Sequence, residues 1–138
     1  MNKFEEVRSQ FEQALIRLEE ALAQPKNDFM RDSAIQRFEF TLDLAWKSVQ
    51  IYLKDIHGID CNSPKSCFRE AFRVDLIDYD DFWIDLVDKR NETVHTYVEE
   101  LAQEVYKVLP QAVVLFHKLL IKITKKQHWG SGAGQEDR

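Results

Sequence analysis

The sequence predicts an all-α protein, an antiparallel up-and-down bundle of about five helices in which the last helix is kinked. Apolar residues recur every three or four positions over long stretches, which places them on one face of a helix. The chain has four glycines and three prolines among 138 residues, too few turn-forming residues for a β-sandwich or barrel. A chain of this length supports one hydrophobic core. We therefore expect one helical domain over residues 1–127 and a disordered tail, without periodicity, over 128–138.

Two long helices open the chain. The first ends before Pro25, because the residue preceding a proline avoids helical angles. Its apolar stripe comprises Phe4, Val7, Phe11, Leu15, Leu18 and Leu22. The second begins near Phe29 and ends at Gly58, a residue suited to a helix C-cap. Its stripe comprises Ile35, Phe38, Leu42, Ala45, Val49, Tyr52 and Ile56. Phe40, Leu44 and Ile51 lie off this stripe, which predicts a second neighbour, within the bundle or across a dimer interface.

Three further helices complete the predicted bundle. Ser63 and Pro64 form a start signal for a short third helix, with the serine as N-cap and the proline in the first turn. The acidic run at 78–81 opens the fourth helix, where negative charge is favourable. Residues 96–99 resemble a capping box for the last helix, and Pro110 within it predicts a kink. Its apolar stripe comprises Leu101, Val105, Leu109, Ala112, Phe116, Leu119 and Ile123.

Composition and charge restrict the kinds of ligand. The formal net charge is −5, which argues against general nucleic-acid binding but leaves room for one local basic pocket that handles a phosphate. Cys61 and Cys67, with His57 before them, form no recognised zinc pattern. We expect two reduced thiols near a loop, and neither a metal nor a cofactor. No apolar stretch approaches the ~20 residues that cross a membrane, and the first residues lack a secretory signal, so we expect a cytoplasmic protein without membrane association.

A charged residue interrupts the apolar stripe of the fourth helix. At 100° per residue, Trp83, Val87, Arg90 and Val94 fall within about 60° of one another. A guanidinium among apolar neighbours requires a carboxylate, a phosphate or a water-filled cleft, because burying it unpaired is costly. Asn91 and His95 lie four residues apart on the flank of this stripe, within reach of Arg90.

These three side chains suit phosphate chemistry. Arginine offers a planar fork of donors that matches phosphate oxygens, histidine exchanges a proton near neutral pH, and asparagine can hold a hydroxyl or orient the imidazole. Cleavage of RNA through its own 2′-hydroxyl requires a base, an acid and charge stabilisation, without a metal. The spacing equally allows Arg90 to pair with an acid, Asp85, Asp88 or another, beside a histidine bonded to a helix-end carbonyl.

Other candidate groups have simpler interpretations. The carboxylates at 80, 81, 85 and 88 are typical of a solvated helix face with acids at its N-terminus. The aromatic residues of the second helix are expected in the core rather than as stacking surfaces for bases; they are Phe38, Phe40, Trp46 and Tyr52. His117 lies in the middle of a helix without an obvious partner.

The segment 90–97, RNETVHTY, resembles the Arg-Asn-x3-His-x-Tyr signature of HEPN domains. Residues 36–47 are similar to the second helix of one branch of that family, known as nucleotidyltransferase substrate-binding proteins or HepT toxins. Further similar residues are Ser63-Pro64-Lys65, Arg69-Glu70-Ala71 and Trp83. The resemblance covers roughly residues 3–125 and is much more specific than an arginine and a histidine at this spacing alone.

The resemblance implies a function and partners. HEPN proteins of this branch form homodimers whose signature motifs face each other across a cleft, and active members are metal-independent endoribonucleases. By this likeness Arg90 would bind the scissile phosphate, His95 would act as general acid or base, and Asn91 would position one of them. Tyr97 matches the tyrosine that a minimal nucleotidyltransferase, usually encoded next door, adenylylates to silence the toxin. The alternative is a non-catalytic nucleotide-binding or substrate-binding subunit of a two-component nucleotidyltransferase; the chain itself lacks the Gly-Ser and paired-aspartate motif of that enzyme.

Overall fold

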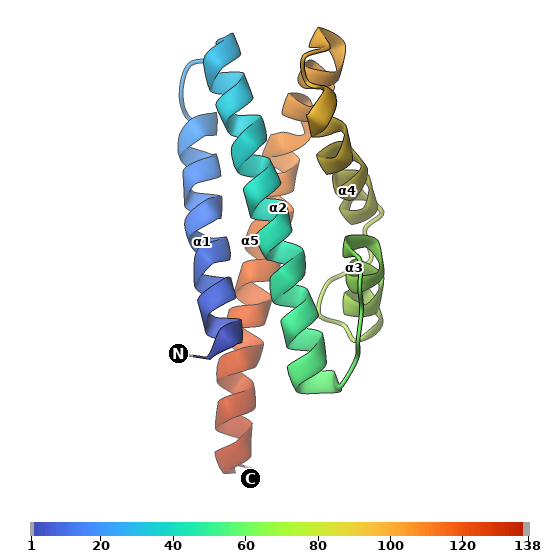
Figure 1. The fold of residues 1–138 in the computed structure, drawn as a ribbon. Coiled ribbons are helices and arrows are strands. Elements are labelled where there is room, and N and C mark those ends of the chain that lie inside the picture. The colour runs from blue at the N-terminus through green and yellow to red at the C-terminus, as the bar shows by residue number, and fades with distance from the viewer. Residues whose placement is uncertain (1, 137–138) are drawn as a thin grey trace.

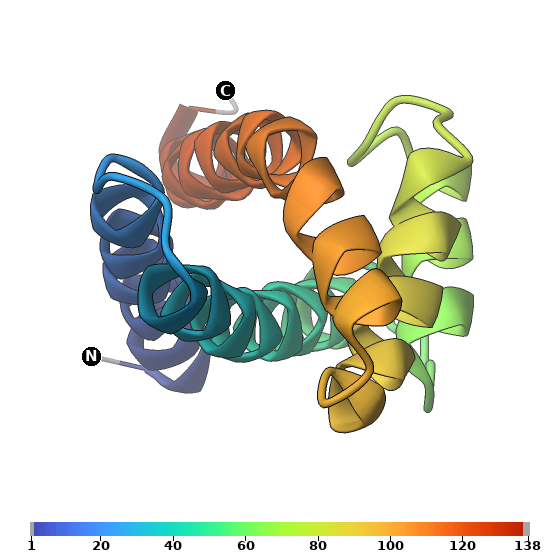
Figure 2. The ribbon, with the colours of Figure 1, turned by 90° about the horizontal axis from the view of Figure 1, so that it is seen from above.

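The computed structural model describes the backbone of residues 2–136 and the side chains of residues 2–125. Its helices are α1 (Lys3–Leu22), α2 (Asp28–His57), α3 (Pro64–Arg73), α4 (Phe82–Glu92), the 3₁₀ helix η1 (Thr93–His95) and α5 (Glu99–Glu136). The described part of the chain contains no strand, so the predicted all-α bundle is confirmed. In Figures 1 and 2, α1 and α2 run antiparallel, α5 packs along them, and the shorter α3 and α4 lie beside α2.

The predicted apolar stripes form most of the core. In α1 the residues from Phe4 to Leu18 of the stripe are buried, and the helix begins with a capping box between Asn2 and Glu5. In α2 the stripe is buried as far as Tyr52, whereas Ile56 is 53% exposed. Ile56 lies in the last turn, where Gly58 ends the helix in the left-handed conformation with φ of 66°, so no neighbouring helix covers it.

Four aromatic side chains join the short helices to the long ones. Phe68 of α3 stacks on Trp83 of α4 with ring centroids 4.5 Å apart. Trp83 also contacts Phe116 of α5 at 5.9 Å, and Phe116 contacts Phe38 of α2 at 6.3 Å. Because these rings are almost entirely buried, they fix where α4 begins relative to α2 and α5.

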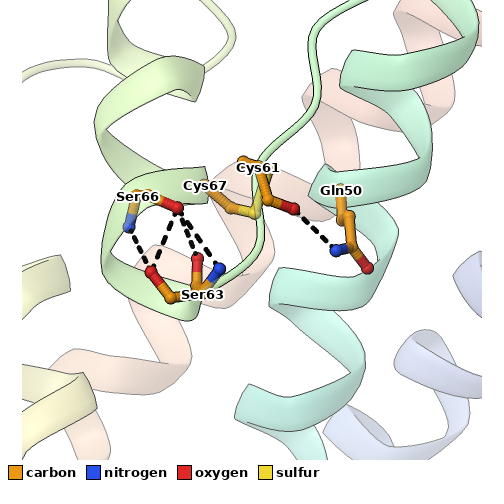
Figure 3. The surroundings of a disulfide bond; sticks show 5 residues. All are labelled: Gln50, Cys61, Ser63, Ser66 and Cys67. Atoms are coloured by element: carbon orange, nitrogen blue, oxygen red, sulfur yellow. Dashed lines mark hydrogen bonds between the residues drawn. A yellow bond between two sulfur atoms is a disulfide. The ribbon is translucent and has the colours of Figure 1, made fainter.

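The connection from α2 to α3 corrects the prediction of two reduced thiols. Cys61 and Cys67 form a disulfide bond, with Cα atoms 5.2 Å apart, and both are buried. Gln50 of α2 donates a hydrogen bond from Nε2 to the Cys61 carbonyl at 2.7 Å (Figure 3). Ser63 caps α3 as predicted, since its side chain accepts from the Ser66 backbone. The chain therefore turns back at Ser63 and brings the two cysteines together, which their six-residue separation alone did not indicate.

The start of α5 also differs from the prediction. This helix begins at Glu99, and Thr96 forms no capping box; its hydroxyl instead donates to the Thr93 carbonyl at 3.1 Å. Residues 93–98, here called the 93–98 turn, connect α4 to α5. Pro110 lies inside α5, which changes direction along its length in Figure 2.

Two further predictions concern the C-terminal tail and membrane association. For the predicted disordered tail, 128–138, the structure describes no side chains, and residues 137 and 138 lie outside the described residues altogether. The described backbone is helical as far as Glu136. The prediction for the tail stays a prediction. Among the described residues, none of the helices combines the length and apolar character needed to cross a membrane.

Candidate functional site

Arg90 lies in the last turn of α4 and is held by two carboxylates of α2. Its Nε and Nη2 donate to the two oxygens of Asp43 at 3.2 and 3.1 Å, and its Nη1 donates to Glu39 Oε2 at 3.0 Å. Glu39 and Asp43 are four residues apart and therefore share one face of α2. The hydrogen bonds that Arg90 donates to Asp43 are the main cause that raises the pKa of Arg90, against the lowering effect of its burial. The Arg90 side chain remains 29% exposed, so it is not closed off from solvent.

The structure shows which of the expected partners Arg90 has, and it corrects the predicted apolar stripe of α4 at one position. Trp83 and Val87 are buried, but Val94 is 65% exposed. The α-helix ends at Glu92, and in the following 3₁₀ turn Thr93 takes the buried position. The spacing had left open whether Arg90 pairs with an acid or binds a phosphate. In the structure it pairs with acids. The acids come from α2, whereas Asp88 pairs with Lys65 of α3 at 2.7 Å.

Thr93 connects the arginine cluster to the 93–98 turn. Its Oγ1 lies 2.6 Å from Glu39 Oε2 and 2.7 Å from the Arg90 carbonyl oxygen, and Arg90 Nη1 donates to it at 3.4 Å. The single hydroxyl proton is thus shared between two acceptors. This fixes the first residue of the turn against α2.

The opposite end of the turn is held by a second arginine, Arg31 of α2, which is 5% exposed. Its Nη1 donates to Glu99 Oε2 at 2.7 Å, and its Nε donates to Asp32 at 3.2 Å. The hydrogen bond from Arg31, and then that from Gln103, lower the pKa of Glu99. Two arginine clusters therefore anchor the two ends of the 93–98 turn to the same helix.

His95 and Tyr97 lie together on the exposed part of this turn. His95 Nδ1 is 3.3 Å from Tyr97 Oη, and the two rings meet edge to face with centroids 5.9 Å apart. Tyr97 is 82% exposed, and Asn91 is exposed as well. Within the described chain no hydrogen bond joins Arg90 to Asn91 or to His95. The structure thus brings His95 and Tyr97 together and directs Arg90 toward α2.

The turn has the groups for proton transfer and for modification. An imidazole has both a proton donor and a proton acceptor, and an exposed phenol is accessible to an enzyme. Among the described residues, no group of three His, Cys, Asp or Glu side chains is placed to hold a metal ion. Sequence reasoning did not identify Arg31, Glu39, Asp43 or Thr93. The signal for Glu39 and Asp43 was their place in the segment 36–47, which carried the family resemblance.

Comparison with known proteins identifies the family. A family described as nucleotidyltransferase substrate binding protein like matches residues 6–125. A probable ribonuclease HepT from Haemophilus influenzae is 30% identical over 106 residues, which cover 74% of this chain and 73% of the relative.

Solved structures agree with this assignment. A crystal structure of a Thermus thermophilus protein has a TM-score of 0.76 and 38% identity, over 80% of this chain and 95% of that one. A Haemophilus influenzae structure has a TM-score of 0.65 and 27% identity, over 88% of this chain and 96% of the other; it is described as the fold of a substrate binding domain of a nucleotidyltransferase. The predicted resemblance is confirmed, and the chain belongs to the HepT-like family of nucleotidyltransferase substrate binding proteins.

Proposed function

We propose that this chain is the HEPN toxin subunit of a two-gene toxin–antitoxin module, a metal-independent endoribonuclease. The observation that carries the proposal is the complete motif 90–97, which spans the end of α4 and the 93–98 turn, in a chain 30% identical to a probable ribonuclease HepT. The proposed active site is composite, with Arg90 of one protomer and His95 of the other in a homodimer.

The chemistry needs only side chains. In RNA cleavage the 2′-hydroxyl oxygen attacks phosphorus while the bond from phosphorus to the 5′ oxygen breaks. One proton leaves the 2′-hydroxyl and another is taken up by the 5′ oxygen, and His95 serves as base or acid in one of these transfers. The solvent-facing part of Arg90 stabilises the charge that builds on the phosphate oxygens, while Asp43 and Glu39 keep its guanidinium oriented. Asn91 positions one of these groups.

A second protomer accounts for two features of the turn. In one chain Arg90 is directed to α2 and His95 to solvent, so a partner copy is needed to bring an arginine and a histidine to the same phosphate. The turn also exposes apolar side chains that a protein contact would cover: Val94, Tyr97 and Val98 are 65%, 82% and 37% exposed.

Tyr97 is the proposed site of control by a cognate minimal nucleotidyltransferase. Its hydroxyl lies 3.3 Å from His95 Nδ1, so an AMP group on that oxygen would cover the imidazole and place a negative phosphate where RNA must approach. We expect both partners in the cytoplasm.

Purified protein provides the test. The wild type should cleave total cellular RNA in the presence of EDTA, and His95→Ala should lower the rate by about 10² to 10⁴-fold without changing the melting temperature. His117→Ala is the matched control, because His117 contacts Glu19 on α1 at 2.8 Å, away from the turn. Wild-type protein that leaves RNA intact when freed of its partner would contradict the proposal.

A second candidate function is a non-catalytic nucleotide-binding or substrate-binding subunit of a two-component nucleotidyltransferase. It is favoured by the likeness to the Haemophilus influenzae substrate binding domain. Calorimetry with ATP and the cognate nucleotidyltransferase separates the two. Nucleotide binding that survives His95→Ala, in a protein that cleaves no RNA, would support this second function.

A further inference from the structure

A hollow of about 150 Å³ lies between α1 and α2 and is lined by Gln13, Ala14, Arg17, Arg37 and Phe40. We call it the α1–α2 groove. We propose that this groove binds the phosphate groups of single-stranded RNA through its two arginines, with one base stacked on the Phe40 ring. This inference rests on the proposed ribonuclease function and extends it with a surface that holds the substrate.

Four other arginines of the described chain are paired with a carboxylate, whereas Arg69 of α3 is not. Arg8, Arg31 and Arg90 each have a carboxylate within ion-pair distance. Within the described part of the chain, neither Arg17 nor Arg37 has one; Arg37 makes a long hydrogen bond of 3.4 Å from Nε to Ser33 Oγ. In a protein of net charge −5, two arginines without a carboxylate partner line one hollow, so positive charge gathers locally on this part of the surface. Their planar donors match phosphate oxygens.

Phe40 supplies the second element of a single-strand binding surface. The sequence predicted this residue in the core or, as an off-stripe position, against a neighbour across a dimer interface. It is 52% exposed in the middle of α2, so the core prediction was wrong, and the dimer alternative stays a prediction. Every base presents a π-face to an exposed aromatic ring, and proteins that bind single strands combine such rings with cationic grooves. A phenylalanine at the edge of a hollow with two arginines has this combination.

Along α2, Phe40 lies between Arg37 of the groove and Asp43, a partner of Arg90. On α2, Arg37, Phe40 and Asp43 follow at intervals of three residues, each step advancing about 4.5 Å and turning about 60° around the helix. Asp43 accepts the hydrogen bonds from Arg90. Figure 1 shows α2 between α1 and α4. One strand crossing α2 can therefore contact the groove, stack on Phe40 and present a phosphate near Arg90.

Binding is tested with a probe that cannot be cleaved: a fluorescein-labelled single-stranded 12-mer of 2′-O-methyl RNA, measured by fluorescence anisotropy with the full chain. The double variant R17A/R37A should bind at least about tenfold more weakly. Each lost phosphate contact lowers the slope of log affinity against log salt by about 0.7, so loss of two should lower it by about 1.4. Phe40→Ala should weaken binding about tenfold without changing this slope, and Phe40→Trp should retain it.

The control is R69A/R73A, which removes the same charge from α3. It should bind the probe within about twofold of the wild type, because nonspecific attraction changes little. Wild-type affinity in R17A/R37A, or an equal loss in the control, overturns the inference. So does a groove variant that changes the sedimentation of the protein while leaving RNA affinity intact, because the groove is then an interface between proteins.

The outcomes separate this inference from the proposed function. If the wild type binds the 2′-O-methyl probe through the groove but cleaves no unmodified RNA, the ribonuclease function fails and the groove inference stands. If the wild type cleaves RNA and R17A/R37A binds normally, the groove inference alone fails.

Discussion

The two connections on either side of the α3–α4 pair are held by different chemistry. The α2–α3 connection is fixed by the buried Cys61–Cys67 disulfide and a hydrogen bond from Gln50 (Figure 3). The α4–α5 connection, which is the 93–98 turn, is fixed by charge, through Arg90 at one end and Arg31 at the other. A covalent bond is insensitive to pH and salt, whereas ion pairs respond to both.

The exposed His95 and Tyr97 belong to the connection that depends on charge. If the proposed function holds, an RNA phosphate or an AMP group at this turn would act on the same electrostatics that anchor it. The other connection carries no candidate site residue and has a fixed geometry. The predictions below test this contrast.

The largest effect on stability is expected from the disulfide. In the double variant C61A/C67A the free energy of unfolding should fall by about 2 kcal/mol, because the unfolded chain regains the freedom of a short closed loop. Urea unfolding measures it, and the loss should be the same at low and high salt. An unchanged urea midpoint would show that the bond does not stabilise this connection.

A smaller loss, about 1 to 2 kcal/mol, is expected for Arg90→Ala. Without the guanidinium, Asp43 and Glu39 are left one turn apart, with side chains 38% and 25% exposed, and repel each other. Adding Asp43→Asn should recover part of the stability, which a double-mutant cycle measures by thermal unfolding. If Arg90→Ala melts at the wild-type temperature, this end of the turn is anchored by something other than the cluster.

The smallest expected effect is a change in how the stability of the fold depends on pH, through the ion pair of Arg31 with Glu99. Arg31 lowers the pKa of Glu99 in the folded protein. As the pH falls, Glu99 therefore takes up its proton in the unfolded state before it does so in the folded state. The stabilisation from the Arg31–Glu99 ion pair is present above the ordinary glutamate pKa, and it is lost as the pH falls through the lowered pKa of the folded protein. The effect is small because the Glu99 side chain is 57% exposed.

Melting temperatures across this acid range provide the measurement. Glu99→Gln should flatten the dependence of stability on pH, whereas Glu100→Gln, the exposed neighbouring residue, should leave it as in the wild type. If the melting temperature depended on pH equally in the wild type and in Glu99→Gln, the Arg31–Glu99 ion pair would not stabilise this end of the turn.

Apolar periodicity predicted most of the fold. The stripe from Phe4 to Leu18 and the capped start of α3 at Ser63 are as expected, because burial of one helix face leaves a repeating pattern in the sequence. Phe40 was predicted in the core but is exposed. An apolar side chain away from the stripe is buried only where another helix covers it, and the sequence does not show where the helices lie. The disulfide was missed because its formation depends on the path of the loop between the cysteines.

The candidate site was predictable only in part. The motif 90–97 has a recognisable sequence, and it spans the last residues of α4 and most of the 93–98 turn. The partners of Arg90, Asp43 and Glu39, are 47 and 51 residues away along the chain. They reach Arg90 because of the way α2 packs against α4. Spacing along the chain does not record how two helices pack, so the sequence favoured a paired arginine without identifying its partners on α2.

The most direct test of the composite active site mixes two inactive variants, Arg90→Ala and His95→Ala, under conditions that allow the subunits to exchange. In a mixed dimer one site lacks both groups, and the other combines the Arg90 of one protomer with the His95 of its partner. Each variant alone should cleave RNA poorly, and the mixture should recover roughly a quarter of the wild-type rate, because half of the dimers carry one complete site of two. A mixture no more active than its two components would contradict the account.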